Sequence, residues 1–421
     1  MKIIGVQAVP ITGGWYCDDK AAFTAGKVET DHYLMQGNPQ TPGFNAVREV
    51  GHGIGIILHL ENGHAVYGDG TSVTYAGTAG RDAIFRFEEH AGEFEERIEP
   101  WLVGQDITNF VQLAEGVETL SWRGRRLHTA VRYAVSQALL EGAGQALRCT
   151  KAEVLAKSYG LRISDAPIRV GIQSGTDRYA AVDKAIYHRV DVFPHGLIHN
   201  VAEDFGRSGE KLIDYAMWIV ARLAAHRVEP NYRPVMHFDC YGTIGRAFGG
   251  DVNRMADYFI RLKEVVSPLF LQIESPVEMD SQAAQIEVLG NLRELLAARG
   301  DHISLIADEW CNTLDDVSLF AQAKAVDIVQ VKMPDLGGLT QSVKAVLECK
   351  RHGVGAYLGG SCNETDLNAR TAVHVALATG AEQVLARPGM GVDESVCIMR
   401  NEEARLRAII KRQEESRKSS T

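Results

Sequence analysis

Eight short apolar segments follow one another in the second half of the chain, and this repeat constrains the fold more than any other feature. Each segment alternates or runs apolar over a few residues, as buried strands do. They span 168–173, 190–198, 234–242, 269–276, 303–310, 327–335, 355–364 and 383–391. The segments between them are amphipathic: from Lys211 to His226, for example, apolar residues recur at i, i+3 and i+4. Eight strands alternating with helices over roughly 230 residues predict a TIM-type (β/α)8 barrel, and the strand count disfavours a doubly wound open sheet.

The first 160 residues have a different pattern, in which strands precede helices. Strands are predicted at 3–9, 52–60 and 64–75, and helices at 82–99, 106–117 and 127–146. Residues 61–63, Glu-Asn-Gly, are typical of a hairpin turn. Residues 12–45 are rich in Gly, Pro, Asp and Thr, so we expect a long loop there. The chain is therefore predicted to have an α+β capping domain over 1–160, a catalytic barrel over 161–413 and a frayed tail over 414–421.

The composition limits the classes of function that the chain can have. Its 421 residues include 44 basic and 54 acidic ones, a net charge of −10, so it lacks the basic excess of a nucleic-acid-binding protein. Its seven cysteines form no CxxC pair, which indicates reduced thiols in the cytoplasm. No uncharged apolar run approaches about 18 residues, so we expect neither a membrane span nor a signal peptide. No GxGxxG motif follows a predicted strand, which argues against a nucleotide site.

Three consecutive predicted strands each end in an acidic residue: Asp239, Glu274 and Asp308. In such a barrel the chemistry lies at the carboxyl ends of the strands. Three carboxylates that converge there would repel one another unless they shared a divalent cation, and ligation by oxygen alone suits Mg²⁺. Each acid taken singly could be an ordinary helix cap or loop residue. The same position on three consecutive strands favours a metal site.

Candidate bases lie on two further strands. Gln330 and Lys332 alternate with valines on the next strand, so both should face the barrel interior. A buried lysine there would have a lowered pKa and could act as a general base, although a lysine at a strand end can also simply extend to solvent. His195 ends the second strand, on the opposite wall. His237, two residues before Asp239, should line the core or surround the site.

Long motifs now support a resemblance. They are HFDCYGTIG (237–245), ADEWCNT (307–313), QVKMPDLGG (330–338), GGSCNET (359–365) and VLARPGMGVDE (384–394), with AGTAGRD (76–82) and RGRRLHTAVRYAVSQALL (123–140) in the cap. The order of acids and lysine behind an α+β cap resembles the enolase superfamily. The motifs closely resemble the methylaspartate ammonia-lyase family, and the similarity extends to about residue 413.

The resemblance implies a carbon–nitrogen lyase that reversibly eliminates ammonia from L-threo-3-methylaspartate to give mesaconate. It implies Mg²⁺ as cofactor, admits a monovalent activator such as K⁺, and suggests a homodimer. Matching positions would make Asp239, Glu274 and Asp308 the metal ligands, Lys332 the base for the (2S,3S) substrate and His195 its counterpart for the opposite C3 configuration. The remaining matched positions would contact the substrate: Gln330 and His195 at the metal-bound carboxylate, Gln173, Ser361 and the backbone of Cys362 at the other carboxylate and the amino group, and Leu385 at the alkyl group.

Three positions depart from the pattern of the family. Gly171 stands where the family commonly has Phe, Thr74 where it has Gln, and Ser361 where it has Thr. Ser361 keeps the hydroxyl, whereas Gly171 and Thr74 are smaller and would enlarge the site. A larger 3-alkylaspartate such as 3-ethylaspartate is therefore the alternative substrate, unless Ile172, Tyr357 or Leu358 fills the space. The rival functions are another proton abstraction of the enolase superfamily and a catalytically silent binding protein. The intact set of acids, lysine and histidine argues against the second.

Overall fold

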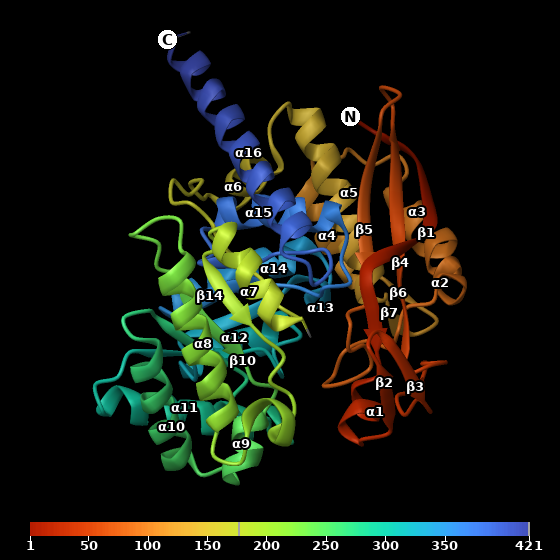
Figure 1. Ribbon diagram of the computed structural model, residues 1–421. Helices are drawn as coiled ribbons and strands as arrows, with labels where there is room; N and C mark the ends of the chain where they lie inside the picture. The colour runs from red at the N-terminus through yellow and green to blue at the C-terminus, as the bar shows by residue number, and fades with distance from the viewer. Residues whose placement is uncertain (176, 420–421) are drawn as a thin grey trace.

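The structure is a computed structural model that describes residues 1–175 and 177–419. An antiparallel sheet and a group of helices, from the N-terminal part of the chain, lie beside a barrel of parallel strands surrounded by helices (Figure 1). The strands of the barrel form the closed order β10-β11-β12-β13-β14-β15-β8-β9. The predicted fold class, a (β/α)8 barrel preceded by an α+β cap, is confirmed.

The cap is built on three antiparallel strands in the order β1-β4-β5. Their bounds are Ile3–Asp18, Arg48–Leu60 and Ala65–Thr71. Gly63, with φ +83°, lies in the predicted turn between β4 and β5. The helix α5 (Thr129–Leu147) crosses β5 so closely that a Cβ at Gly70 would lie 1.9 Å from the carbonyl oxygen of Ala130. Glycine at this position thus allows the helix to pack on the sheet.

The other elements of the cap are short. They are α2 (Phe87–Glu93), the π-helical turn Phe94–Ile98, α3 (Glu99–Leu102), α4 (Phe110–Thr119), the ribbon β6 (Ser121–Trp122) and β7 (Arg125–Arg126), and α6 (Lys151–Tyr159). The predicted helix over 82–99 begins later than expected and the one over 106–117 is shifted, whereas the one over 127–146 agrees closely with α5.

The long loop expected over 12–45 is wrong. The strand β1 continues to Asp18, and a helix α1 (Lys20–Thr24) and a hairpin of β2 (Val28–Asp31) and β3 (Leu34–Gly37) follow it. The side chain of Asp19 accepts the backbone N–H of Ala21 and so caps α1. The Gly, Asp and Thr residues that suggested a loop serve instead as a cap, as turn residues and as close contacts to the barrel: a Cβ at Gly14 would lie 2.4 Å from Pro388.

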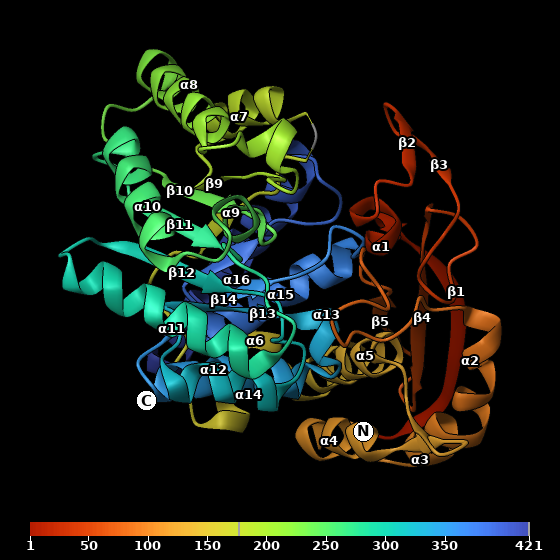
Figure 2. The same cartoon turned by 90° about the horizontal axis from the view of Figure 1, so that it is seen from below.

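All eight predicted barrel strands are present, each somewhat shorter than predicted. They are β8 (Arg169–Gly171), β9 (Val192–His195), β10 (Val235–Asp239), β11 (Leu271–Glu274), β12 (Ile303–Ala307), β13 (Ile328–Lys332), β14 (Gly355–Gly359) and β15 (Gln383–Leu385). Because neighbouring strands are parallel, their carboxyl ends meet at one mouth of the barrel, on the side that faces the cap loops (Figure 2).

Helices cover the outside of the barrel between the strands. They are α7 (Arg178–Tyr187), the π-helical turn Val201–Phe205, α8 (Glu210–His226), α9 (Thr243–Phe248), α10 (Val252–Val266), α11 (Gln282–Ala298), α12 (Leu314–Ala323), α13 (Met333–Leu336), α14 (Leu339–Arg351) and α15 (Asp366–Thr379). None of the helices within the described residues is long and apolar enough to cross a membrane.

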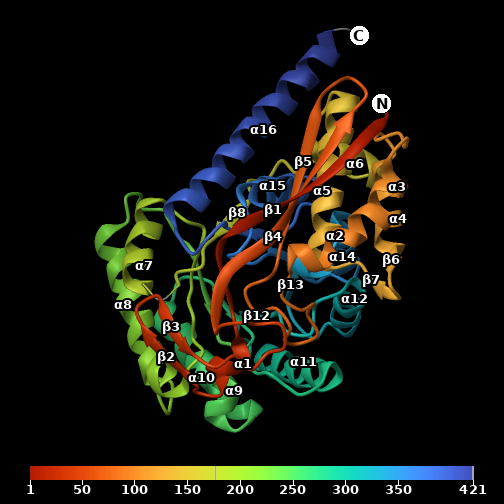
Figure 3. The same ribbon diagram turned by 90° about the vertical axis from the view of Figure 1, so that its right-hand side faces the viewer.

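The last helix, α16, runs from Asp393 to Ser419 and projects from the body of the molecule (Figure 3). The frayed tail expected over 414–421 therefore differs from the structure up to residue 419, and residues 420–421 lie outside the described part. Residues 414–419 are all charged or serine in the sequence, so this last part of α16 carries no apolar residue to bury.

Candidate active site

A cavity opens at the carboxyl ends of the barrel strands and is roofed by the cap loop 72–86. The cavity is lined by ten of the twelve residues that the sequence singled out: Thr74, Gln173, His195, Asp239, Asp308, Gln330, Lys332, Ser361, Cys362 and Leu385. Glu274 is fully buried and Gly171 is buried, and neither belongs to the lining of the cavity. Residues that are more than 300 positions apart in sequence thus meet at one site because the barrel closes.

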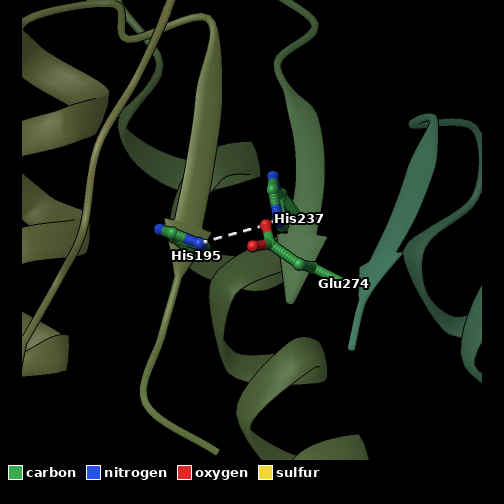
Figure 4. Close-up of side chains that lie close together, drawn as sticks. All are labelled: His195, His237 and Glu274. Atoms are coloured by element: carbon green, nitrogen blue, oxygen red, sulfur yellow. Dashed lines mark hydrogen bonds and ion pairs between the residues drawn. The ribbon is translucent and has the colours of Figure 1, made fainter. Parts of the chain in front are cut away.

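Glu274 ends β11 and is held by groups from three other strands, β9, β10 and β13; Figure 4 shows the two histidines among them. Its Oε2 lies 2.7 Å from Nε2 of His237 and 3.3 Å from Nε2 of His195, and its Oε1 accepts from the amide of Gln330. Burial alone would raise the pKa of Glu274, but the two histidines outweigh it and hold that pKa well below its ordinary value. His237, which the sequence placed in the core or around the site, is therefore a direct partner of this carboxylate.

Asp239 lies beside Glu274 in the register of β10 and β11. Burial, followed by the charges of Glu274, Glu309 and Asp308, raises the pKa of Asp239 well above its ordinary value. This shift reports an excess of buried negative charge at the barrel mouth. Oδ1 of Asp308 has no hydrogen-bond partner among the described residues and lies 3.7 Å from a terminal nitrogen of Arg81. A divalent cation would relieve this excess of negative charge.

The three predicted metal ligands are not the tightest cluster of donor atoms in the structure. Donors of His195, His237 and Glu274 lie within 4.8 Å of one another. Asp239 adjoins this cluster, with Oδ2 3.7 Å from Nε2 of His195. The histidines contact Glu274 in this arrangement, whereas the carboxylates of Asp239 and Asp308 line the open cavity. The residues present fit a cation that prefers oxygen ligands, with the histidines beside it.

Lys332 ends β13 and pairs with Asp308, its Nζ 2.8 Å from Oδ2. The sequence predicted a lowered pKa for this buried lysine, and the structure gives the opposite direction. Burial does lower the pKa of Lys332, but the adjacent carboxylate of Asp308 outweighs burial and raises it. The ion pair could not be anticipated, because Asp308 and Lys332 lie on different strands.

On the cap side, two departures from the family pattern touch each other. Oγ of Ser361 accepts the backbone N–H of Thr74 at 2.9 Å and lies 3.0 Å from its hydroxyl. The backbone N–H of Ser361 in turn donates to Glu364 at 2.8 Å. Ser361 and Cys362 therefore line the cavity from a loop whose conformation is stabilised by the hydrogen bond to Glu364.

The sequence predicted open space at Gly171, but a Cβ atom added there would already be in tight contact with its neighbour. A Cβ at this position would lie 3.3 Å from Cβ of Val192, which is tight contact with the neighbouring strand. Gly171 also does not belong to the lining of the cavity. Gln173, two residues further along, does line the cavity as expected.

The contacts of Arg81 in the cavity were not predicted from the sequence, although Arg81 belongs to the motif AGTAGRD (76–82). Arg81 reaches from the cap loop into the cavity, and its Nε donates to Asp335 at 2.7 Å. The pair of Glu364 and Arg387, which lies wholly inside the protein, was not predicted either. A lone basic residue in a glycine-rich loop carries no local signal of such a contact.

A closed parallel barrel whose mouth holds buried acids, a lysine and a histidine under an α+β cap defines an enzyme of the enolase type. Comparison with known proteins then gives the family. Residues 1–160 match the family described as methylaspartate ammonia-lyase N-terminus, and residues 162–412 match its C-terminus. The chain belongs to the methylaspartate ammonia-lyase family, and it is a lyase.

Similar proteins span the whole chain. Methylaspartate ammonia-lyase 2 of Carboxydothermus hydrogenoformans is 46% identical over 98% of this chain and 99% of its own. The Mg-complex of beta-methylaspartase from Clostridium tetanomorphum has a TM-score of 0.93 at 42% identity, over 98% of this chain and all of its own. The Citrobacter amalonaticus enzyme containing (2S,3S)-3-methylaspartic acid has a TM-score of 0.95 at 42% identity, with the same coverage.

Proposed function

We propose that this chain reversibly eliminates ammonia from (2S,3S)-3-methylaspartate to give mesaconate. The observation that carries the proposal is the pair of bases, Lys332 and His195, on walls of one cavity with buried carboxylates between them. A similar enzyme, 42% identical, has been seen containing this amino acid. Family membership supports the same class of reaction.

Asp239, Glu274 and Asp308 would hold Mg²⁺, the metal present in a similar enzyme. When bound, this ion would stabilise the negative charge that develops on the substrate carboxylate next to C3. Gln330 and His195 both contact Glu274. With their remaining hydrogen-bonding atoms they would bind the substrate carboxylate next to C3. Gln173, Ser361 and the backbone of Cys362 would bind the other carboxylate from the far side of the cavity.

Lys332 would remove the proton from C3 of the (2S,3S) substrate. The C3–H electrons become the C2=C3 double bond, the C2–N bond breaks, and the amino group leaves as ammonia. Lys332 must be neutral to accept the proton, so its contact with Asp308 has to loosen on substrate binding. His195, from β9, would take the C3 proton of the opposite configuration.

Other features remain proposals of the same kind. We infer Leu385 as the wall at the alkyl group, because it lines the cavity. Methyl is the alkyl group we propose, since Gly171 does not line the cavity and a Cβ there would already be in tight contact with Val192. A homodimer, activation by K⁺, a cytoplasmic location and a division into a cap over 1–160 and a barrel over 161–413 follow from the sequence and its resemblance.

The test is to mix the metal-loaded enzyme with (2S,3S)-3-methylaspartate and follow the ultraviolet absorbance of the conjugated product. Lys332→Ala should lose this activity by about 10²–10⁴-fold, the usual contribution of a general base. His195→Ala should mainly affect the (2S,3R) substrate. Asp308→Asn should bind Mg²⁺ weakly and be inactive while remaining folded. Equal losses of both diastereomers in both base variants would refute the two-base arrangement, and racemisation without a conjugated product would indicate the rival enolase-type reaction.

A further inference from the structure

The cap loop between β5 and α2 carries a single guanidinium into the barrel mouth. Arg81 follows two residues with left-handed backbone, Ala79 (φ +51°) and Gly80 (φ +81°). A backbone hydrogen bond of 3.0 Å from Arg81 to Thr78 closes the turn, and the amide of Asn312 on the barrel donates to the carbonyl of Ala79. The turn is thus fixed against the barrel, and the side chain of Arg81 is only 4% exposed.

Arg81 contacts two carboxylates that both act on Lys332. Its Nε donates to Oδ2 of Asp335 at 2.7 Å, and a terminal nitrogen lies 3.7 Å from Oδ1 of Asp308. The other oxygen of Asp308 accepts from Lys332 at 2.8 Å. Asp335 lies in α13, three residues after Lys332, and its charge also attracts the lysine ammonium. Among the described residues, Arg81 is the only cation in ion-pair contact with Asp335.

These contacts set up a competition for the lysine. Without Arg81, Asp335 would be a buried anion with no counter-ion, which is costly, and the ammonium of Lys332 would be drawn toward it. We propose that Arg81 is a positioning residue for Lys332: by neutralising Asp335 and pairing with the outer oxygen of Asp308, it keeps Lys332 on the side of the cavity that faces the substrate. This inference rests on the proposed role of Lys332 as the base for the (2S,3S) substrate.

The other base provides an internal control. His195 contacts Glu274 and Asp239, and neither of these carboxylates is in ion-pair contact with Arg81. Loss of Arg81 should therefore disturb one base and spare the other. A purely structural role, in which Arg81 only fastens the cap to the barrel, would impair both diastereomers alike.

The experiment compares Arg81→Gln with the double variant Arg81→Gln/Asp335→Asn, which leaves no unpaired charge and is the safer variant for folding. In Arg81→Gln, kcat for (2S,3S)-3-methylaspartate should fall by about 10²-fold, the cost of misplacing a reacting group by roughly 1 Å, and kcat for the (2S,3R) diastereomer by less than about threefold. The double variant should regain at least about tenfold of the loss, because the competing anion is gone. Equal losses for both diastereomers, an unchanged kcat in Arg81→Gln or a double variant no better than the single one would overturn the proposal.

A second readout does not depend on turnover. Calorimetric titration of the metal-free proteins with Mg²⁺ should show that Arg81→Gln binds the ion as tightly as the parent or more tightly, since a positive charge beside Asp308 has been removed. Binding weakened by more than about tenfold would show that the metal site itself has been disturbed and would overturn the positioning role. Lys332→Ala, assayed in parallel, separates the two proposals. If it keeps its (2S,3S) activity, the assignment of the base fails, whereas the Arg81 proposal alone fails if Lys332→Ala loses activity and Arg81→Gln does not.

Discussion

Arg387 and Glu364 form an ion pair beneath the loop that carries Ser361. Both side chains are 0% exposed, and Nε of Arg387 lies 3.1 Å from Oε2 of Glu364. Glu364 also accepts from the hydroxyl of Tyr133 at 3.1 Å and from the backbone N–H of Ser361 at 2.8 Å. Arg387→Met would remove the counter-ion and leave a buried carboxylate with these two donors. Breaking one side of a buried pair costs about 3–5 kcal/mol, and we expect the lower end because the hydrogen bonds remain.

The loss of unfolding free energy in Arg387→Met should depend on pH, and the pKa of Glu364 decides in which direction. Burial already raises the pKa of Glu364, in opposition to Arg387, and the variant should raise it further. When a carboxyl group has a higher pKa in the folded than in the unfolded state, the folded state loses stability as the pH rises above the pKa of the unfolded state. The difference in unfolding free energy between variant and parent should therefore be small near about pH 5 and grow toward about pH 8, by at most about 1.4 kcal/mol per pH unit.

The assay is urea unfolding of metal-free protein followed by circular dichroism at several pH values. The matched control is Arg387→Met/Glu364→Gln, which removes both charges at similar volume and should come within about 1–2 kcal/mol of the parent at every pH. A single variant whose loss of stability is the same at both ends of the pH range would refute this reasoning. So would a double variant that is no more stable than the single one.

Three further predictions concern the metal, a buried histidine and the substrate. Chelation should abolish activity, and Mg²⁺ at about 100 times its Kd should stabilise the fold by about 2.7 kcal/mol, seen as a higher melting temperature that Asp308→Asn does not show. Burial lowers the pKa of His374 to about 4 from 6.5. Stability should therefore fall as the pH drops from 6.5 toward 4, by at most about 3 kcal/mol, and the curve for His374→Asn, which keeps an acceptor for the N–H of Ala152, should be flatter in urea titrations. Because Gly171 does not line the cavity and a Cβ there would be in tight contact with Val192, kcat/KM should favour 3-methylaspartate over 3-ethylaspartate, and a preference for ethyl would contradict this.

The barrel could be predicted because its signals are local. A buried parallel strand is a short apolar run, and residues such as Asp239 and Asp308 interrupt each run where the strand reaches the mouth. The spacing of these acids predicted that they meet at one site, and Asp239 and Asp308 do line the same cavity. The part of the cap over 12–45 could not be predicted in this way, since its conformation depends on partners far along the chain. The backbone N–H of Gly14, for example, donates to the carbonyl of Glu364.

The same limit explains the error on Lys332. A lysine on an apolar strand has a predictable burial but not a predictable partner. Burial alone would lower its pKa, and the direction reversed because Asp308, on the neighbouring strand, contacts its ammonium. The charged partner of a buried group decides whether its pKa is raised or lowered. A partner on a neighbouring barrel strand cannot be identified from the sequence pattern alone.

The barrel and the cap contribute different residues to the site. The proposed metal ligands all lie at the ends of barrel strands, and the cap supplies partners for groups around them: Thr74 for Ser361, Arg81 for Asp335 and Asp308, and Lys20 for Glu309, at 3.6 Å. The barrel's own residues can therefore form the proposed metal site, whereas the loop at Ser361 and the pair of Lys332 and Asp308 also contact the cap, through Thr74 and Arg81. Changes in the cap loop should accordingly alter which diastereomer reacts and how fast, while leaving the affinity for Mg²⁺ close to that of the parent.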